Sequence, residues 1–185
     1  MTATGEDLLK QKFRRLIDMD FQVYAEVRGR HLVHSSTVVI DFLLFPTQCL
    51  TENGFDKVWF GVEVKHFGKP GETGKMSRFI CQCASYVQSE FTVGKKAVRP
   101  AFVLGFSDVY SANREGEEYL MQWLGMLRLA ALLKVGMFSE ISPSSFYPDG
   151  GWKIEFSSSL YFKATRGRYE RKEYNISKVN VGNCT

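Results

Sequence analysis

The sequence predicts a mixed α/β fold in one domain spanning residues 1–185. The 185 residues are 44% hydrophobic and 24% charged, which suits a globular domain with a full-sized core. Helix-like and strand-like patterns alternate in the order α-β-β-β-α-β-α-β-β, without repeats, low-complexity tracts or linkers. This order is typical of a mixed sheet that carries helices on its faces.

The first third of the chain predicts one helix and three strands. Residues 6–17 form an amphipathic helix whose apolar side chains share one stripe: Leu8, Leu9, Phe13, Leu16 and Ile17. Two β-type runs follow at 21–27 and 37–46, and Pro46 ends the second. A turn-rich stretch at 47–56, which includes Asn53-Gly54, leads into a third strand at 57–66, KVWFGVEVKH.

The remainder predicts two helices and at least three strands. A Gly- and Pro-rich loop at 67–75 precedes a helix at 76–91, with Ser77 as a possible N-cap. The apolar run 99–106 is typical of a buried strand. A long helix at 115–134 has acids in its first turn and Lys134 in its last, which suits the helix dipole. Strands within 151–158 and 159–176 close the fold.

Positive charge is concentrated at the C-terminal end. The net charge is +4, and residues 151–185 hold seven Lys or Arg against three acids, so this segment accounts for the whole excess. Aromatic residues lie between these cations, a combination that suits a polyanion such as nucleic acid. The alternative is an ordinary charged surface strand.

Other features of the sequence predict a cytoplasmic protein without a membrane partner. No stretch approaches the roughly 18 uncharged apolar residues of a membrane helix, and the first residues lack the apolar run of a secretory signal. The four cysteines lack paired CxxC spacing, so we expect free thiols: Cys49, Cys81, Cys83 and Cys184.

Two acids and a lysine stand out within apolar strands. Asp41 lies in VVIDFLLF, where an isolated ionised carboxylate would be costly unless it had a partner. A nearby Arg or Lys could be that partner. The next strand, however, offers Glu63, and two close carboxylates repel unless a positive charge lies between them. Carboxylates with a backbone carbonyl, here that of Val64, are ligands that Mg²⁺ accepts.

Lys65 has a natural role beside such an ion. Strand alternation places it on the same face as Glu63. An ammonium there can orient an attacking water or stabilise negative charge that develops on a phosphate. The pattern therefore predicts a divalent-metal site built from Asp41 and from the Glu63-Val64-Lys65 segment.

These residues resemble the PD-(D/E)xK nucleases, in which a strand with Asp precedes a strand with (D/E)-x-K and then a helix. Asp41, Glu63 and Lys65 match, whereas Ile40 stands where the family has Pro. On the following helix, Gln82 and Tyr86 lie four residues apart. They are similar to the Q-x-x-x-Y motif of the RecB-like exonuclease branch.

The resemblance covers residues 6–106 and implies a restriction-endonuclease-like αβββαβ core with flanking helices and extra C-terminal strands. It implies a nuclease that uses Mg²⁺, with Mn²⁺ as substitute, to leave a 5′-phosphate. Asp41, Glu63 and Val64 would hold the metal. An acid near the N-terminus would complete the metal shell, with Glu6 as first candidate and Glu26 as substitute. Gln82 and Tyr86 would contact the nucleic acid.

Nucleic acid, with DNA as the expected form, is therefore the predicted partner, and a protein partner or homodimer is compatible. The candidate phosphate-binding cations are Lys69, Lys75, Arg78, Arg166, Arg168, Arg171 and Lys172. A catalytically inactive nucleic-acid-binding or protein-interaction module on the same fold is the alternative function. The choice between DNA and RNA, and between exo- and endonuclease, stays open at this stage.

Overall fold

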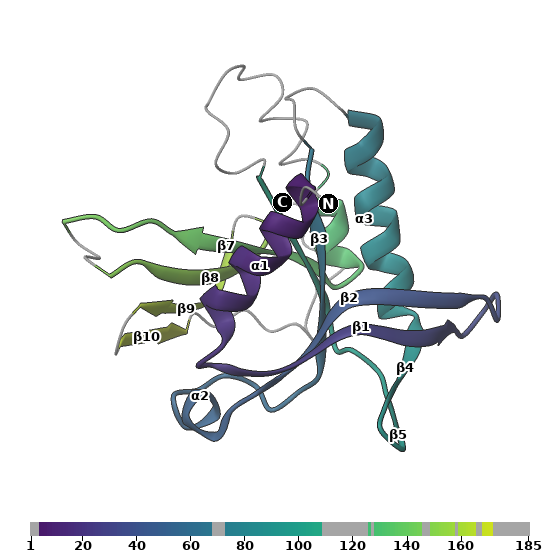
Figure 1. Cartoon of the computed structure of the whole chain (residues 1–185), viewed down its shortest axis with the longest axis horizontal. Coiled ribbons are helices and arrows are strands. Elements are labelled where there is room, and N and C mark those ends of the chain that lie inside the picture. Colours follow the sequence, from purple (N-terminus) through teal and green to yellow (C-terminus); the bar gives the residue numbers. More distant parts are fainter. Residues whose placement is uncertain are drawn as a thin grey trace, which may run out of the picture.

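The computed structural model describes residues 4–67, 73–108, 126, 128–145, 149–157, 159–165 and 168–171. Within this part, ten strands form one mixed sheet in the order β10-β9-β8-β7-β6-β3-β2-β1-β4-β5 (Figure 1). The elements are α1 (Gly5–Ile17), β1 (Phe21–His31), β2 (Thr37–Pro46), α2 (Gln48–Glu52), β3 (Phe60–Lys65), α3 (Thr73–Val87), β4 (Ser89–Val93), β5 (Lys96–Val98), β6 (Val103–Ser107), β7 (Val135–Ile141), β8 (Gly151–Phe156), β9 (Ser159–Thr165) and β10 (Arg168–Arg171).

The two main helices cover opposite faces of the sheet. Phe13 and Ile17 of α1 are buried in one apolar cluster together with Phe42, Val62 and Leu104. A second cluster on the other face contains the buried side of α3: Met76, Phe79, Cys83 and Tyr86. Because strand residues alternate between faces, neighbouring residues of β2 and of β6 supply both clusters.

Helix α1 begins with a reciprocal capping box. The Thr4 hydroxyl accepts a hydrogen bond from the Asp7 N–H, and the Asp7 carboxylate accepts one from the Thr4 N–H. Phe13 then lies between the rings of Phe42, Phe106 and Phe138, with ring centroids 5.0–5.2 Å apart. The helix is thereby fixed along the sheet with a defined start beside the end of β3.

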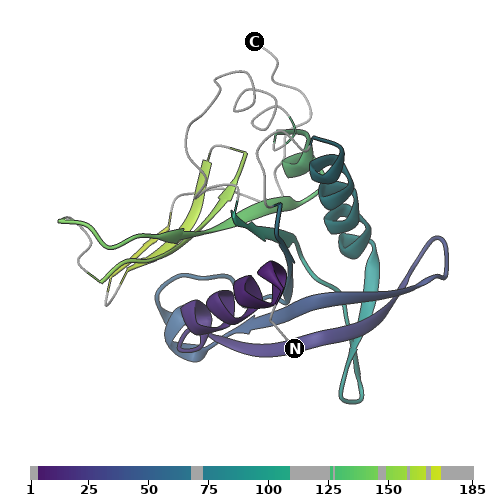
Figure 2. The ribbon, with the colours of Figure 1, turned by 45° about the horizontal axis from the view of Figure 1, so that its top comes forward.

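The central strands combine antiparallel and parallel pairing. β1, β2 and β3 form an antiparallel meander, and β6 then pairs with β3 in parallel. The connection from β3 to β6 runs through α3 and through the β4–β5 hairpin, whose first strand pairs with β1. Figures 1 and 2 show the β1–β2 hairpin extending away from the rest of the molecule.

The predicted mixed α/β class is confirmed, as is the strand at 37–46. The third strand begins only at Phe60, and the strand predicted at 99–106 is observed as β6, from Val103. The predicted helix at 76–91 is wrong at both ends. Helix α3 is already helical at Thr73, so Ser77 is not its cap, and Ser89 begins β4. Predicted helix 115–134 falls largely outside the described residues; residues 126 and 128–132 are helical.

Helix α2, the β4–β5 hairpin and β7 were not predicted from the sequence. Strand β7 was not predicted because the residue before it, Lys134, has a left-handed φ of 60°, a conformation that Gly or Asn usually adopts at a helix end. Three of the predicted free thiols are confirmed, at Cys49, Cys81 and Cys83, whereas Cys184 lies outside the described residues. No helix in the described part of the chain is long and apolar enough to cross a membrane.

Candidate metal and active site

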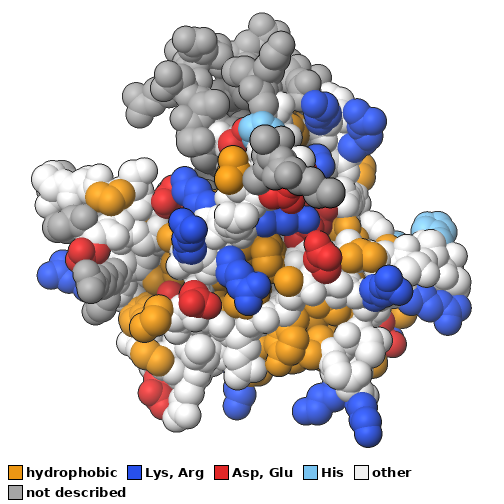
Figure 3. All heavy atoms as spheres, viewed as in Figure 1, with side chains coloured by type: hydrophobic (Ala, Val, Ile, Leu, Met, Phe, Trp, Pro, Cys, Tyr) orange, Lys and Arg blue, Asp and Glu red, His pale blue; other side chains and the backbone are white. Residues whose placement is uncertain are grey.

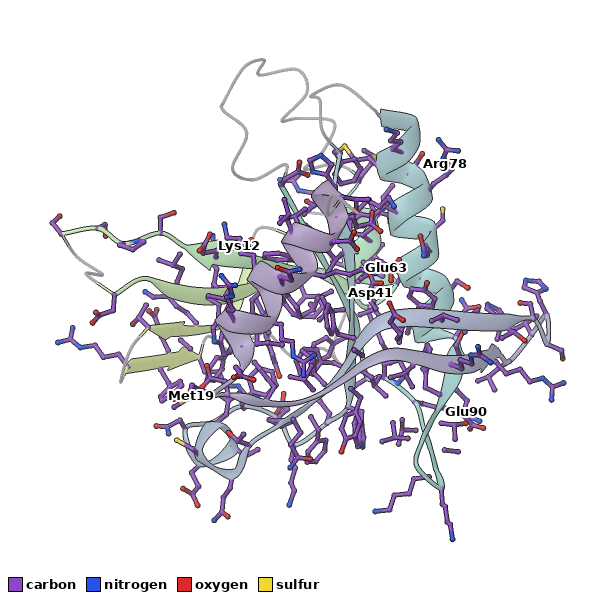
Figure 4. The ribbon with its side chains drawn as sticks, in the orientation of Figure 1. Lys12, Met19, Asp41, Glu63, Arg78 and Glu90 are labelled. Carbon is purple, nitrogen blue, oxygen red and sulfur yellow. The ribbon has the colours of Figure 1, made fainter. Side chains whose placement is uncertain are left out.

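The site forms where β2 and β3 separate. Their ladder pairs Leu44 with Phe60, Leu43 with Gly61 and Phe42 with Val62, which brings Asp41 level with Glu63. Beyond this point the carboxylates of Asp41 and Glu63 take the place of backbone carbonyls as acceptors between the two strands. The Val64 N–H donates to Asp41 Oδ2 over 2.9 Å, and the Asp41 N–H lies 3.4 Å from Glu63 Oε2. Both carboxylates therefore occupy the gap between the two strands, between α1 and α3 (Figure 4).

The backbone of Val64 faces the same gap. The N–H and C=O of one strand residue point to the same side, and the Val64 N–H bonds to Asp41. Gly61, an odd-numbered residue of the same strand, bonds instead to the β6 side through Phe102. The Val64 carbonyl predicted as a ligand thus points toward β2 and the two carboxylates.

Glu63 is held in an environment that opposes its ionisation. The residue is only 6% exposed, and Oε1 accepts a 2.6 Å hydrogen bond from Gln82 of α3. Burial raises the pKa of the Glu63 carboxyl, and the nearby Asp41 charge raises it further, to about 8. This environment therefore favours the protonated form of the Glu63 carboxyl, although Lys10 and Lys65 partly offset the effect.

Asp41 has a cationic partner that the sequence analysis did not identify. Lys10 Nζ of α1 lies 2.5 Å from Asp41 Oδ1. Partial burial alone would lower the pKa of the Lys10 ammonium, but its hydrogen bond to Asp41 and the charges of Asp41, Glu6 and Glu26 raise it. The earlier alternative, in which a Lys or Arg neutralises Asp41, is thus present in the structure.

The spacing of α1 contained a signal for Lys10. Glu6, Lys10, Phe13 and Ile17 recur at intervals of four, three and four residues, so they share one side of a helix. Phe13 and Ile17 are buried against the sheet, and the same side must carry Glu6 and Lys10 toward the strand ends. Charged residues that continue the apolar stripe of a helix therefore indicate side chains directed at the sheet, once the face on which the helix docks is known.

Lys65 and the two acids proposed to complete the metal shell are also near this gap. Lys65 Nζ forms a 2.8 Å ion pair with Glu6 Oε2, so Glu6 contacts the lysine. Glu26 lies on β1 between Ala25, which pairs with Phe42, and Val27, which pairs with Ile40, and this register puts Glu26 across from Asp41. Glu26 is exposed and has a left-handed φ of 50°.

The strands bend at the level of Asp41. Ile40 and Leu43 both pack into the α3-side cluster, whereas Phe42 packs on the α1 side. Regular alternation would put Ile40 with Phe42, so alternation breaks at Asp41. The positive φ of Glu26 marks the same level on β1. This bend leaves the Asp41 side chain in the plane of the sheet, within reach of Lys10 on one side.

Gln82 and Tyr86 lie on one face of α3, as the spacing predicts, and form a chain of hydrogen bonds. Gln82 Nε2 donates to Glu63 and also to the Tyr86 hydroxyl, 2.7 Å away. That hydroxyl donates in turn to the Val39 carbonyl over 2.7 Å. Tyr86 is only 4% exposed. Tyr86 is thus part of the core and its hydroxyl holds the Gln82 amide, and its contact with nucleic acid stays a prediction.

Among the residues that the structure describes, the predicted phosphate-binding cations do not gather around this site. Lys75 and Arg78 lie near the start of α3, and Figure 4 shows Arg78 directed away from Asp41 and Glu63. Arg171 of β10 is paired with Asp56, 3.1 Å away, and Arg168 lies on the same strand. Four strands separate β10 from β3. Lys69, Arg166 and Lys172 lie outside the described residues.

Among the residues that the structure describes, no three His, Cys, Asp or Glu side chains come together as a metal-binding group. Asp41 and Glu63 form a pair of carboxylates, accompanied by Val64 and by the lysines Lys10 and Lys65. Comparison of the chain with protein-family models, with curated proteins and with solved structures finds no match.

Proposed function

We propose that the protein is a divalent-metal-dependent nuclease that hydrolyses phosphodiester bonds in nucleic acid, with DNA as the expected substrate. One observation carries the proposal: Asp41 and Glu63 meet in the gap between β2 and β3, with Lys65 and Gln82 beside them. If the additional α2, β4 and β5 are left aside, the chain order α1-β1-β2-β3-α3-β6 follows the αβββαβ pattern that the resemblance implies, which supports the proposal. A restriction-endonuclease-like core is part of this proposal.

The residues at the gap fit a small, hard cation. Asp41 and Glu63 would hold Mg²⁺, or Mn²⁺ as substitute, together with the Val64 carbonyl, and Mg²⁺ usually keeps several waters in addition to one or two carboxylates. A positive charge between the two acids would relieve the repulsion that raises the pKa of Glu63. When bound, such an ion supplies charge stabilisation at the phosphate and lowers the pKa of a coordinated water.

The chain's own residues have separate roles in this proposal. The Lys65 ammonium, anchored by Glu6, would orient the attacking water and offset negative charge on the scissile phosphate. Gln82, held by Glu63 and Tyr86, would contact the substrate strand beside the carboxylates. Tyr86 acts indirectly, because its buried hydroxyl fixes the Gln82 amide.

The structure also offers an observation that favours a second candidate function. Lys10 already neutralises Asp41, and Glu63 is held in the protonated form, so the acids are satisfied without a metal. Such a cluster would suit a catalytically inactive nucleic-acid-binding or protein-interaction module on the same fold. Cleavage separates the two functions.

The test is a digestion panel of linear, circular, single-stranded and branched DNA and RNA, with Mg²⁺, with Mn²⁺ and with EDTA. We expect metal-dependent cleavage by the wild type and background cleavage by Asp41→Asn, which should still bind the substrate. Glu140→Gln, which removes a surface carboxylate paired with Lys12, is the matched control and should cleave normally. Wild-type cleavage by Asp41→Asn would refute the site, and binding without cleavage by the wild type would favour the second function.

A further inference from the structure

Two lysine–carboxylate pairs connect α1 to the strand ends. Lys10 of α1 contacts Asp41 of β2, and Lys65 of β3 contacts Glu6 of α1. Each pair joins one residue of the helix to one residue of the candidate site. The helix that packs on the sheet through Phe13 and Ile17 therefore also sets the charge around the two site carboxylates.

Asp41 is fully engaged in this arrangement. Oδ1 contacts the Lys10 ammonium and Oδ2 accepts from the Val64 N–H. The side chains of Lys10 and Asp41 are 26% and 13% exposed, so solvent screens their attraction less than at an open surface. A divalent cation that uses Asp41 as a ligand would bind the same carboxylate as the Lys10 ammonium. The cation and the ammonium would then be close together, and their like charges repel.

We infer that Lys10 is an internal counter-ion that competes with the divalent cation for Asp41 and leaves Asp41 when the cation binds. The inference rests on the metal site of the proposed function and adds a positioning residue to it. Lys10 replaces part of the missing positive charge in the metal-free protein, which keeps Asp41 and Glu63 close together without an ion. The same contact lowers the apparent affinity for the ion, because only molecules with Lys10 displaced can bind it.

Glu26 is the acceptor that the structure offers to a displaced Lys10. It lies across from Asp41 in the β1–β2 register, it is exposed, and its charge already acts on Lys10. Its left-handed backbone, with φ of 50°, is unfavourable for a non-glycine residue and is found preferentially at functional positions. A move from Asp41 to Glu26 would keep Lys10 paired while it frees Oδ1.

Calorimetric titration of the full chain with Mg²⁺ and with Mn²⁺ tests the inference without any activity measurement. Lys10→Met should raise the affinity for the cation by roughly tenfold or more, because it removes the competitor. Glu26→Gln should lower the affinity, because a displaced Lys10 then has no acceptor. Lys12→Met is the matched control, since it removes the same charge from the same helix but from a pair with Glu140, and its affinity should equal that of the wild type.

Thermal unfolding shows whether each variant is folded, so that a loss of binding is not confused with a loss of structure. Lys10→Met should be less stable than the wild type in EDTA and should gain more stability from Mg²⁺, and Lys10→Arg should restore the wild-type affinity. Equal or weaker cation binding by folded Lys10→Met would overturn the inference while the metal site stands. An unchanged affinity in Glu26→Gln would overturn its role as acceptor. Absence of binding in the wild type and in every variant would refute the metal site itself, whereas binding by Lys10→Met alone would support the competition.

Discussion

At the residue scale, Asp41 and Glu63 carry the same chemical group in opposite electrostatic environments. Asp41 has the Lys10 ammonium and the Val64 backbone N–H as partners. Glu63 is buried and lies beside the Asp41 charge, so its pKa is raised to about 8. A divalent cation would be attracted by one acid and would release the proton of the other, which couples cation binding to pH.

The raised pKa of Glu63 predicts a pH-dependent loss of stability in EDTA. Below about pH 4.5 the carboxyl is protonated in the folded and the unfolded chain. As pH rises toward about 8 the unfolded chain releases this proton first, so the folded state binds more protons and its stability falls with pH. The penalty is complete above the folded pKa. Glu63→Gln should therefore become more stable relative to the wild type across this window, by on the order of 3–5 kcal/mol at about 1.4 kcal/mol per pKa unit.

Urea unfolding at several pH values between 4.5 and 8.5 provides this measurement. Glu140→Gln serves as control, because it removes a surface carboxylate with a solvent-accessible partner, and its stability relative to the wild type should change far less over the same range. A constant difference between Glu63→Gln and the wild type would mean that Glu63 does not keep its proton on folding.

Sequence reasoning identified Asp41, Glu63, Lys65 and Gln82 because local rules place them. Alternation along a strand and spacing of four on a helix fix which side chains share a face, and the structure brings these four together. Lys10 was missed because a lysine on an amphipathic helix normally faces solvent. Its contact with Asp41 depends on how α1 docks on the sheet and on the bend at Asp41, neither of which is encoded in adjacent residues.

At the scale of the elements, the separation of β2 from β3 creates the site, and α3 closes one side of it. Helix α3 can approach the sheet because Gly105 of β6 has no side chain. A Cβ there would lie 2.7 Å from the buried Phe79 ring and 3.0 Å from Met137 Sδ. Phe79 precedes Gln82 by about one helical turn. This packing contact therefore fixes how closely Gln82 approaches Glu63 of the sheet.

Gly105→Ala should therefore destabilise the protein by about 1–3 kcal/mol, because the added methyl overpacks the interface between α3 and β6. Unfolding in urea measures the loss. Gly94→Ala is not an adequate control, since its φ is 61° and strain would add to the effect. Gly74→Ala is suitable, because a Cβ there has no atom within 4 Å, and its stability should stay within about 0.5 kcal/mol of the wild type. Unchanged stability in Gly105→Ala would show that α3 can shift without cost.

The strands that were not predicted from the sequence share a physical cause. The β4–β5 hairpin directly follows α3, and Ser89, Glu90 and Phe91 continue its helical pattern until β1 offers an antiparallel partner. β7 follows a helix that ends at Lys134 instead of at a glycine. In both cases long-range strand pairing decides the local conformation, and such pairing depends on the sheet order, which the pattern of apolar residues does not contain.

At the scale of the whole molecule, three of the described cations in the basic C-terminal segment are paired with acids: Lys153 with Glu155, Lys163 with Glu170 and Arg171 with Asp56. Figure 3 shows other Lys and Arg side chains over the β1–β2 hairpin and at the end of the β4–β5 hairpin. Arg28 and Arg30 belong to the former, and both are exposed.

The β1–β2 hairpin leads directly away from the candidate site. Arg28 pairs with Val39 and Arg30 with Thr37 in the register that puts Glu26 across from Asp41. At a rise of about 3.3 Å per residue, these arginines stand roughly 7 and 13 Å along the strand from the level of Asp41. A nucleic acid whose scissile phosphate lies at Asp41 could therefore run along the hairpin, whereas four strands separate β10 from β3.

We therefore predict that Arg28→Gln/Arg30→Gln weakens nucleic-acid binding across all sequences. The slope of log affinity against log salt concentration should become shallower by about 0.9 for each lost phosphate contact, and the double variant loses up to roughly two contacts. Arg168→Gln/Arg171→Gln removes the same charge from β10 and should leave the slope nearly unchanged, because Arg171 already binds Asp56. Titrations of labelled duplex in EDTA at several salt concentrations decide between the two surfaces. If Arg168→Gln/Arg171→Gln reduces the salt slope and Arg28→Gln/Arg30→Gln leaves it at the wild-type value, the C-terminal segment and not the hairpin binds the phosphates. Equal loss in both would indicate that net charge alone, with no defined path for the strand, governs binding.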